Sequence, residues 1–442
     1  MFLVARRLIE PKATRTDPSM VDVSLISINY QPEPTGIAPY VTGLAAGLRA
    51  RGLTVQVTTG YPHYPAWRRD PEFTGLSLCA IEDDSDDHRV RHYIPKNPNT
   101  LKRLLMEATF AIRALGHRHK AGKDATVICT SPTLISAFAA VVRKKATRRN
   151  GAVIVWVQDF YGLGAAETGQ VGGSSLVRLV EVLEGWTLRN ADAVVAIHSS
   201  FKSHIVTHFG LPDSSVTIIK NWTHIDVSTT DSPTADAKGT FGDWPFVVLH
   251  AGNMGRKQGL ENVLDTAELA AQRESTKDIL FVLLGDGNQR PSLERRAEGM
   301  RNVKFVDPLG DKEFSNAIMS ADVLLVNESG SVKGMAVPSK LTSYFAAGRP
   351  VIASAHPESG SAHELAAAGA GVRVDPERPE ELLDAVTQLR KDTDRAQMFG
   401  EMGVRYVESS LTESAALGKF FDLCVAHQQN ASPAGHRSRV SS

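Results

Sequence analysis

Cysteine is scarce in this chain. Only Cys79, Cys129 and Cys424 occur among its 442 residues, and they lie far apart in the sequence. Without paired spacing they indicate neither a disulfide framework nor a thiolate metal site. Long apolar runs are also missing: no stretch of about 18 uncharged apolar residues occurs, so a membrane-spanning helix is not expected. These absences together predict a protein of the reducing, cytoplasmic compartment.

The first 19 residues do not resemble a secretory signal. They contain a short apolar run, but Arg6 and Arg7 interrupt it and no small-residue cleavage pattern follows. We interpret residues 1–19 as an extension that the fold does not need. The polar residues 429–442 are interpreted as a disordered tail.

A net charge is absent, because 49 Lys and Arg balance 49 Asp and Glu, yet the charges are unevenly distributed. Residues 1–220 hold 26 basic and 19 acidic side chains, and residues 101–150 hold 11 and 2. The segment 101–150 is either a solvated helix face or a surface that attracts an anionic membrane or an anionic acceptor. We therefore expect a cytoplasmic protein, with peripheral attachment to the inner face of the membrane as the alternative. Nucleic acid is not an expected partner.

Strand-like and helix-like segments alternate along nearly the whole chain, which predicts an α/β protein with two doubly wound parallel sheets. The predicted strands lie at 21–30, 54–60, 126–131, 152–158, 192–198 and 215–220 in the first half, and at 246–252, 279–285, 302–306, 322–327, 350–354 and 371–375 in the second. The predicted organisation is an N-terminal domain over 20–226, a polar linker over 227–245, a C-terminal domain over 246–405 and a helical segment over 406–428. Ligands of such sheets bind beyond the carboxyl ends of the strands, so the cleft between the halves is the expected site.

The stretch "HAGNMGRKQGLENVL" (250–264) joins a buried-looking strand to an amphipathic helix. It is either an ordinary glycine-containing turn or a loop that binds an anion such as phosphate at the helix N-terminus. A second segment, "AVPSKLTSYFAAGRPVIAS" (336–354), places Lys340 in the first turn of a short helix. A cation is unfavourable there unless an anion is bound. The first βα turn, "NYQPEPTGIAPY" (29–40), contains Gly36 but no G-x-G-x-x-G, which disfavours a nicotinamide-dependent dehydrogenase.

In this order the segments resemble retaining glycosyltransferases of family 4, which have the GT-B fold. Within that family, the resemblance is to the exopolysaccharide subgroup that includes colanic-acid-type fucosyltransferases. The segments that carry it are "SINYQPEPTGIAPYVTGLAAGLRARG", "YPHYP" (61–65), "WVQDF" (156–160), "NW" (221–222), "GNMGRKQGLE" (252–261), "GDG" (285–287) and "VPSKLTSYFAAGRPVIAS" (337–354). The resemblance implies two Rossmann-like domains that face each other across a cleft.

The resemblance also implies an activity: transfer of a hexose-type sugar from a GDP-sugar or UDP-sugar to a glycan or lipid-linked acceptor, in cell-surface or exopolysaccharide synthesis. No cofactor is implied. The donor's diphosphate would lie between Asn253, Gln258 and Lys340. Many members have Arg and Lys where this chain has Asn253 and Gln258. The donor-binding candidates are Gly36, Asn253, Arg256, Lys257, Gln258, Gly287, Ser339 and Ser343, and Lys340 is the candidate that stabilises the leaving diphosphate.

Two departures from the family pattern concern recognition and proton transfer. Many members carry two glutamates eight positions apart, where this chain has Met335 and Ser343. The family's usual His–Asp pair is Gln158–Asp159 here, and an amide cannot act as a general base. Removal of the acceptor's proton therefore falls to Asp159, to His63 at the acceptor side, or to the departing phosphate. The alternatives are that Asp159 is a turn or cap residue and that His63 is a packing residue.

A metal ion is not expected. The acidic run "EDDSDD" (82–87) has the residue types of a metal site, but it lies in a hydrophilic loop between strand-like segments. Two other functions stay open. One is a sugar-nucleotide epimerase on the same fold, which handles a donor without an acceptor. The other is a catalytically weak binding subunit.

Overall fold

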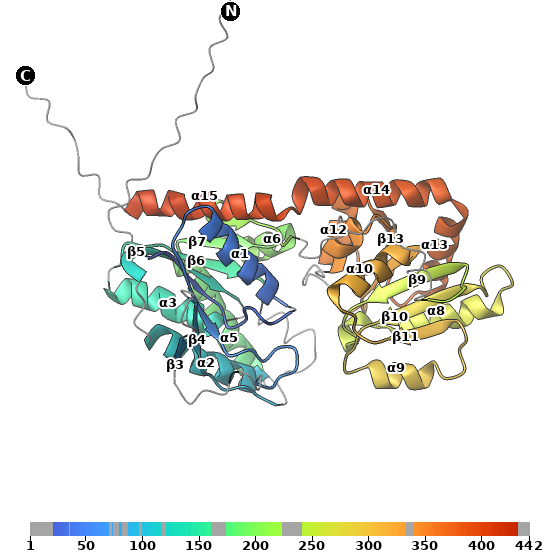
Figure 1. The fold of residues 1–442 in the computed structure, drawn as a ribbon, viewed down its shortest axis with the longest axis horizontal. Helices are drawn as coiled ribbons and strands as arrows, with labels where there is room; N and C mark the ends of the chain where they lie inside the picture. Colours follow the sequence, from blue (N-terminus) through green and yellow to red (C-terminus); the bar gives the residue numbers. More distant parts are fainter. Residues whose placement is uncertain are drawn as a thin grey trace, which may run out of the picture.

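The computed structural model describes most of the chain and shows two α/β lobes (Figure 1). The described residues are 21–34, 36–69, 73, 79–81, 87–96, 100–116, 121–131, 133–147, 149–160, 174–222, 241–332 and 340–431. The predicted extension 1–19, most of the predicted linker and the end of the predicted tail lie outside them. Helix α15 runs to Ala431.

The N-terminal domain is built on a sheet of eight strands within the described residues, in the order β3-β4-β2-β1-β5-β6-β7-β8. All neighbours pair in parallel except β3 with β4. The strands are β1 Val21–Ile26, β2 Val55–Gly60, β3 Cys79–Ile81, β4 Asp87–Val90, β5 Ala121–Thr130, β6 Val153–Val157, β7 Ala193–Ala196 and β8 Val216–Ile218. The helices are α1 Ala38–Ala50, α2 Thr100–Gly116, α3 Leu134–Thr147, α5 Ser174–Asn190 and α6 Ser199–Phe209.

The direction of the connections decides which helices cover which face of this sheet. The chain moves one way across the sheet from β1 to β2, and the opposite way from β4 through β5 and β6 to β7. Right-handed crossovers therefore place α1 on one face and α2, α3 and α5 on the other. Helix α3 packs against both α2 and α5, so these three helices form one continuous layer.

The C-terminal domain has a six-stranded, all-parallel sheet in the described residues, in the order β11-β10-β9-β12-β13-β14. The strands are β9 Phe246–Ala251, β10 Ile279–Leu284, β11 Val303–Val306, β12 Val323–Asn327, β13 Val351–Ser354 and β14 Gly371–Val374. The helices are α8 Glu261–Gln272, α9 Arg290–Arg296, α10 Asp311–Ser320, α11 Lys340–Ala346, α12 Gly360–Ala368, α13 Pro379–Lys391 and α14 Thr393–Ser410. The strand order reverses between β9 and β12, which is where ligands bind in sheets of this kind.

The last helix, α15 (Glu413–Ala431), follows the C-terminal domain in sequence but packs on the N-terminal domain (Figure 1). Leu417, Phe420 and Cys424 belong to the N-terminal core, and the Phe420 ring centroid lies 4.8 Å from that of Trp156. A Cβ atom on Gly47 of α1 would lie 2.2 Å from Leu417 Cδ1, so this glycine allows the two helices to approach. The chain therefore crosses between the lobes twice.

Each predicted parallel strand is present, which confirms the two-sheet fold. Strands β3 and β4 lie on either side of residues 82–86, where the sequence indicated strand-like segments without assigning their bounds, and Asp87 of the acidic run begins β4. β4 has the sequence "DHRV", in which no apolar alternation is visible. Its polar side chains have distant partners instead: Asp87 pairs with Arg49 at 2.6 Å, and His88 Nε2 lies 2.7 Å from Gln56 Nε2.

Candidate functional site

Two glycines bring the loop after β10 against the loop after β9. A Cβ atom on Gly285 would lie 2.1 Å from Gly252 O, and one on Gly287 would lie 2.5 Å from Met254 O. The Met254 N–H donates to Asp286 O at 2.8 Å. The "GDG" segment is therefore required for backbone contact between two loops at the carboxyl edge of the sheet. Gly287 contacts the loop backbone, which is the role that the structure gives this predicted donor-binding residue.

The loop after β9 is also fixed to α11. The Ala251 N–H donates to Tyr344 Oη at 2.7 Å, and Tyr344 is fully buried. Asn327, the last residue of β12, donates from Nδ2 to Gln258 O at 2.7 Å and to Gly259 O at 2.9 Å. A loop held by a helix and a neighbouring strand is pre-organised for a ligand.

Lys340 is the first residue of α11 and points under this loop. Its Nζ lies 3.3 Å from His250 Nε2, and a Cβ atom on Gly252 would lie 3.2 Å from Lys340 Nζ. His250 Nδ1 lies 3.1 Å from Leu325 O. Because a carbonyl can only accept, Nδ1 carries the proton and Nε2 is the acceptor that faces the Lys340 ammonium. The fully buried His250 thus orients the cation.

Burial determines the protonation of both groups. Burial, assisted by the charge of Lys340, holds the pKa of His250 well below its ordinary value, so the imidazole is neutral. Burial lowers the pKa of Lys340 to about 8, and the nearby Glu328 acts in the opposite direction. Lys340 is therefore a cation at neutral pH that has lost part of its hydration, and an anion at this position would be bound strongly.

Glu328 is a residue of this site that the sequence reasoning missed. It directly follows β12 and is 6% exposed. Its Oε1 accepts from Ser361 Oγ at 2.5 Å, whereas Oε2 is buried without a hydrogen-bond partner among the described residues. Burial raises the pKa of Glu328, against the Ser361 hydrogen bond, the neighbouring Ser359 hydroxyl and the charge of Lys340. The sequence feature that could have identified Glu328 is its position, as an acidic residue directly after an apolar strand.

The other donor-binding candidates of this loop have different environments. Asn253 and Arg256 are exposed, and Lys257 is half-buried. Gln258 Oε1 accepts from the Gly255 N–H at 3.1 Å, so this side chain closes the 3₁₀ turn η2 (Arg256–Gln258). Several amide groups of the loop are thus already bonded within the protein. An anion at this loop would therefore be bound by the cations of the loop and by Lys340 more than by the amide groups.

Two serines complete the predicted donor set. Ser343 lies three residues after Lys340 in α11, so it is on the same side of the helix, and it is buried. Ser339 lies outside the described residues, as does Met335.

Asp159 follows β6 at the carboxyl edge of the N-terminal sheet. Its Oδ1 accepts from the Phe160 N–H at 2.8 Å, and its backbone N–H donates to Ser131 Oγ at 3.2 Å. Burial raises the pKa of Asp159, against the Phe160 hydrogen bond and the charges of Lys257 and Arg103. The charge of Lys257 in the loop after β9 thus reaches Asp159, although the two residues belong to different lobes.

The side chain of Gln158 is bonded to another side chain of the N-terminal domain. Its side-chain amide forms a reciprocal pair with that of Asn221, in which Gln158 Nε2 donates to Asn221 Oδ1 at 3.0 Å and Asn221 Nδ2 donates to Gln158 Oε1 at 2.8 Å. This pair explains the "NW" segment that the sequence analysis noted, because Asn221 holds the residue that precedes Asp159.

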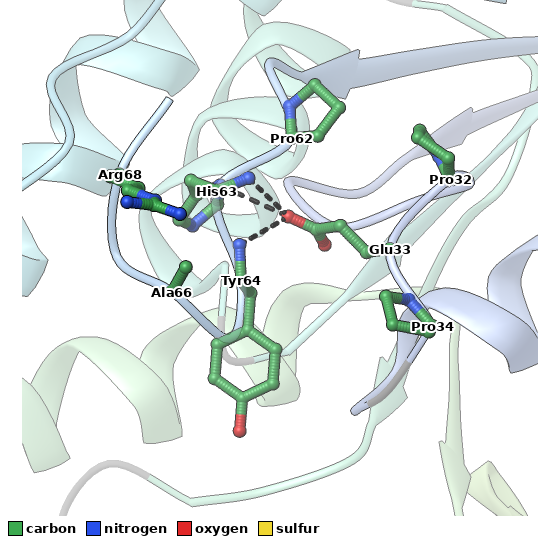
Figure 2. A pocket seen from close by; sticks show the side chains of 8 residues that line it. All are labelled: Pro32, Glu33, Pro34, Pro62, His63, Tyr64, Ala66 and Arg68. Atoms are coloured by element: carbon green, nitrogen blue, oxygen red, sulfur yellow. Dashed lines mark hydrogen bonds and ion pairs between the residues drawn. The ribbon is translucent and has the colours of Figure 1, made fainter. Parts of the chain in front are cut away.

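The loop that carries His63 forms a pocket with the first βα turn (Figure 2). Glu33 Oε1 accepts from the His63 N–H at 2.8 Å and from the Tyr64 N–H at 2.9 Å. The His63 side chain is 2% exposed and its Nδ1 lies 3.0 Å from Tyr61 O. The ring is therefore a packing element in the lining of the pocket. The pocket has a volume of about 230 Å³ and is lined by Pro32, Glu33, Pro34, Pro62, His63, Tyr64, Ala66 and Arg68.

Gly36 lies next to this pocket. It has a φ of 72°, in the left-handed region, and a Cβ atom there would lie 3.3 Å from Tyr64 Cε1. The glycine therefore allows the turn before α1 to pack against the Tyr64 ring.

The described residues contain no group of three or more His, Cys, Asp or Glu side chains that could hold a metal ion. Residues 82–86 of the acidic run lie outside them. Nor does any helix in the described part of the chain have the length and apolar content needed to cross a membrane.

Comparisons with known proteins agree with this geometry. Residues 35–222 match the model of the glycosyl transferase 4-like domain, and residues 245–392 match that of glycosyl transferases group 1. The putative colanic acid biosynthesis glycosyl transferase WcaI of Escherichia coli K12 is 30% identical over 383 residues, which cover 83% of this chain and 91% of WcaI. The chain belongs to the glycosyltransferases.

Solved structures support the fold. Sucrose-phosphate synthase from Thermosynechococcus elongatus superposes with a TM-score of 0.68 at 18% identity, over 93% of this chain and 99% of that one. Anabaena HepE in complex with UDP-glucose superposes with a TM-score of 0.63 at 15% identity, over 91% and 99%. These likenesses establish the two-domain, Rossmann-like GT-B fold.

Proposed function

We propose that this chain is a retaining hexosyltransferase that takes a sugar from a nucleotide-diphosphate sugar, without a metal ion, and transfers it to a glycan or lipid-linked acceptor of cell-surface or exopolysaccharide synthesis. The observation that carries the proposal is Lys340, a half-buried cation oriented by a neutral imidazole under a fixed loop. The colanic acid biosynthesis for which WcaI is named and the UDP-glucose bound to HepE support the substrate classes.

In the proposed reaction the bond between the anomeric carbon and the β-phosphate oxygen breaks, and its electron pair goes to the leaving diphosphate. The acceptor hydroxyl oxygen bonds to the anomeric carbon on the face from which the diphosphate departs, so the anomeric configuration is retained. Negative charge grows on the diphosphate as the bond breaks, so a fixed Lys340 ammonium stabilises the transition state more than the bound donor. Arg256 and Lys257 extend the positive charge along the loop.

We assign removal of the acceptor's proton to Asp159. It lies at the cleft, and burial raises its pKa, which makes its carboxylate a better base than an exposed one. His63 is unsuited to this role because its ring is buried against Glu33 and Tyr61. The pocket that His63 and Tyr64 line is our proposed acceptor side.

The test combines a panel of GDP-sugars and UDP-sugars with wild-type protein and Asp159→Asn. Transfer by the wild type, retention of the anomeric configuration and a large loss of turnover in Asp159→Asn with unchanged affinity for the nucleotide diphosphate are expected. Conversion of the donor to an epimer without an acceptor would establish an epimerase. Binding of a donor without any turnover would establish a binding subunit.

A further inference from the structure

Helix α2 exposes three large apolar side chains on the side that faces away from the sheet. Leu101, Leu105 and Ile112 are 66%, 51% and 73% exposed. Their spacings of four and seven residues place them in one row along the helix. The opposite side of α2 is buried in the core through Met106 and Phe110. The helix is thus apolar on two sides, and only one of them is buried in the core of the domain.

The neighbouring helices of the same layer expose further apolar side chains. Leu179 and Val182 of α5 are 64% and 60% exposed, and Val142 of α3, which packs between α2 and α5, is 40% exposed. We call these six residues the α2–α5 surface: Leu101, Leu105, Ile112, Val142, Leu179 and Val182. The helices that carry it lie together on the side of the N-terminal domain away from α15 (Figure 1). Exposed apolar side chains gathered on one helix layer are typical of docking surfaces.

Basic side chains accompany these apolar ones. Helices α2 and α3 carry Lys102, Arg103, Arg113, Arg143, Lys144 and Lys145, and only one acidic residue, Glu107, which is buried. Helix α5 is balanced, with Arg178 and Arg189 against Glu181 and the buried Glu184. Lys102 and Arg113 lie along the same edge of the α2 row; both are half-buried, and Arg113 Nη1 donates to Arg91 O at 3.0 Å. A helix layer with an exposed apolar row and cations beside it matches the interface of an anionic lipid bilayer, because the cations reach the head groups while the apolar side chains enter below them.

From the sequence we expected charge alone to attract this domain to a membrane. The structure shows a smaller part for charge. Lys144 is paired with Asp192 at 2.5 Å, and Lys145 donates to Asn190 Oδ1 at 2.5 Å and lies over the Trp186 ring. Arg148 lies outside the described residues. Part of the basic cluster thus serves packing within the domain, and the exposed apolar side chains supply a larger share of the docking surface.

The first turn of α2, which carries Leu101, also contacts the wall of the candidate acceptor pocket through Arg103. The Arg103 guanidinium lies 5.0 Å over the Trp67 ring, and the Trp67 ring centroid is 6.0 Å from that of Tyr64, which lines the pocket. Arg103 also contributes to the electrostatics of Asp159. The first turn of α2 therefore joins the docking surface to the cleft.

We infer that the α2–α5 surface docks shallowly in an anionic lipid bilayer and holds the acceptor side of the cleft at the lipid surface. Docking itself is independent of catalysis. The statement that it serves a lipid-linked acceptor rests on the proposed function. The two are tested separately, because vesicle binding needs neither donor nor acceptor.

The experiment is flotation of the full chain with neutral phosphatidylcholine vesicles and with vesicles that also contain phosphatidylglycerol. Wild type is expected to float with the anionic vesicles, and less so at high salt. Leu101→Gln/Leu105→Gln/Ile112→Gln should lose binding on the order of tenfold or more, because the inserted apolar area is removed. The matched control is Met398→Gln/Met402→Gln, two exposed apolar side chains of α14.

Thermal unfolding of each variant checks that the domain remains folded, and Lys102→Gln/Arg113→Gln should weaken binding and flatten its salt dependence. Absence of binding to anionic vesicles, or an equal loss in the α14 control, overturns the inference. So does a dimer, seen by light scattering, that disappears in the triple variant while vesicles are not bound, because the surface would then join two copies. Failure of the proposed function would appear elsewhere, as absent donor turnover with vesicle binding intact.

Discussion

His198 Nε2 lies 2.9 Å from Glu364 Oε2, and this contact joins the N-terminal domain to α12 of the C-terminal domain. The Ser200 N–H donates to His198 Nδ1 at 3.2 Å, so Nε2 carries the proton and donates to the carboxylate. Lys220 Nζ lies 3.1 Å from Glu364 Oε1, and Tyr406 Oη donates to the same oxygen at 2.8 Å. The two lobes therefore meet at a buried carboxylate with three partners.

Glu364→Gln is expected to destabilise the protein by about 1.5–3 kcal/mol at neutral pH, since it removes the charge that accepts these hydrogen bonds. Burial alone would raise the pKa of Glu364, but His198, Lys220 and Tyr406 outweigh it and hold the pKa below 4.5. Its contribution is therefore complete above about pH 4.5 and is lost as the pH falls through the folded-state pKa. Urea unfolding measures the difference, with the exposed Glu408→Gln on α14 as control. A difference that stays constant down to strongly acidic pH would contradict this role.

Lys340→Ala should lower turnover by on the order of 100-fold or more, because a contact that strengthens in the transition state is lost. The variant is compared with Lys312→Ala, which removes an exposed lysine of α10 in the same domain. Steady-state kinetics with the best donor of the panel is the measurement. Wild-type turnover in a folded Lys340→Ala protein would remove this residue from the mechanism.

Affinity for a nucleotide diphosphate should decline as the pH rises through about 8, because Lys340 has a pKa of about 8 and the bound anion requires its protonated form. In Glu328→Gln the decline should begin at lower pH, since the charge of Glu328 raises the pKa of Lys340. Titration calorimetry over neutral and alkaline pH measures both curves. Identical curves for the two proteins would show that Glu328 does not act on Lys340.

Chelation is expected to leave transfer activity intact. The proposed mechanism neutralises the diphosphate with Lys340, Arg256 and Lys257, so no divalent cation is required. Activity is measured after exhaustive treatment with a chelator and again after addition of magnesium or manganese. Loss on chelation with rescue by either metal would overturn metal independence.

The apolar strands and the glycine loops could be predicted from the sequence, because parallel strands covered on both faces form unbroken apolar runs. The place of Lys340 in the first turn of a helix could also be predicted. Its role stays a prediction, based on the conflict between a cation there and the helix dipole. His250 could not be predicted. It lies within the strand "FVVLHA" and is buried, so its role depends on Leu325 and Lys340, which are distant in sequence.

The exposed row of α2 was hidden for a different reason. A helix with Met106 and Phe110 on one side and Leu105 and Ile112 on the other has apolar residues at too many positions to indicate one buried side. The sequence shows that the helix is apolar. Only the packing of α2 against α3 and the sheet decides which residues remain outside.

The return of α15 to the first lobe has a consequence for synthesis on the ribosome. Residues 21–222 emerge first, but Leu417, Phe420 and Cys424 are part of the same hydrophobic core. The surface of α1 at Gly47 and the Trp156 ring lack their contacts with Leu417 and Phe420 until the end of the chain has been translated. The usual order, in which an N-terminal domain completes its folding before the next one is made, is therefore not available to this protein. A chain that stops before Glu413 keeps every candidate site residue and still lacks part of the core of its first domain.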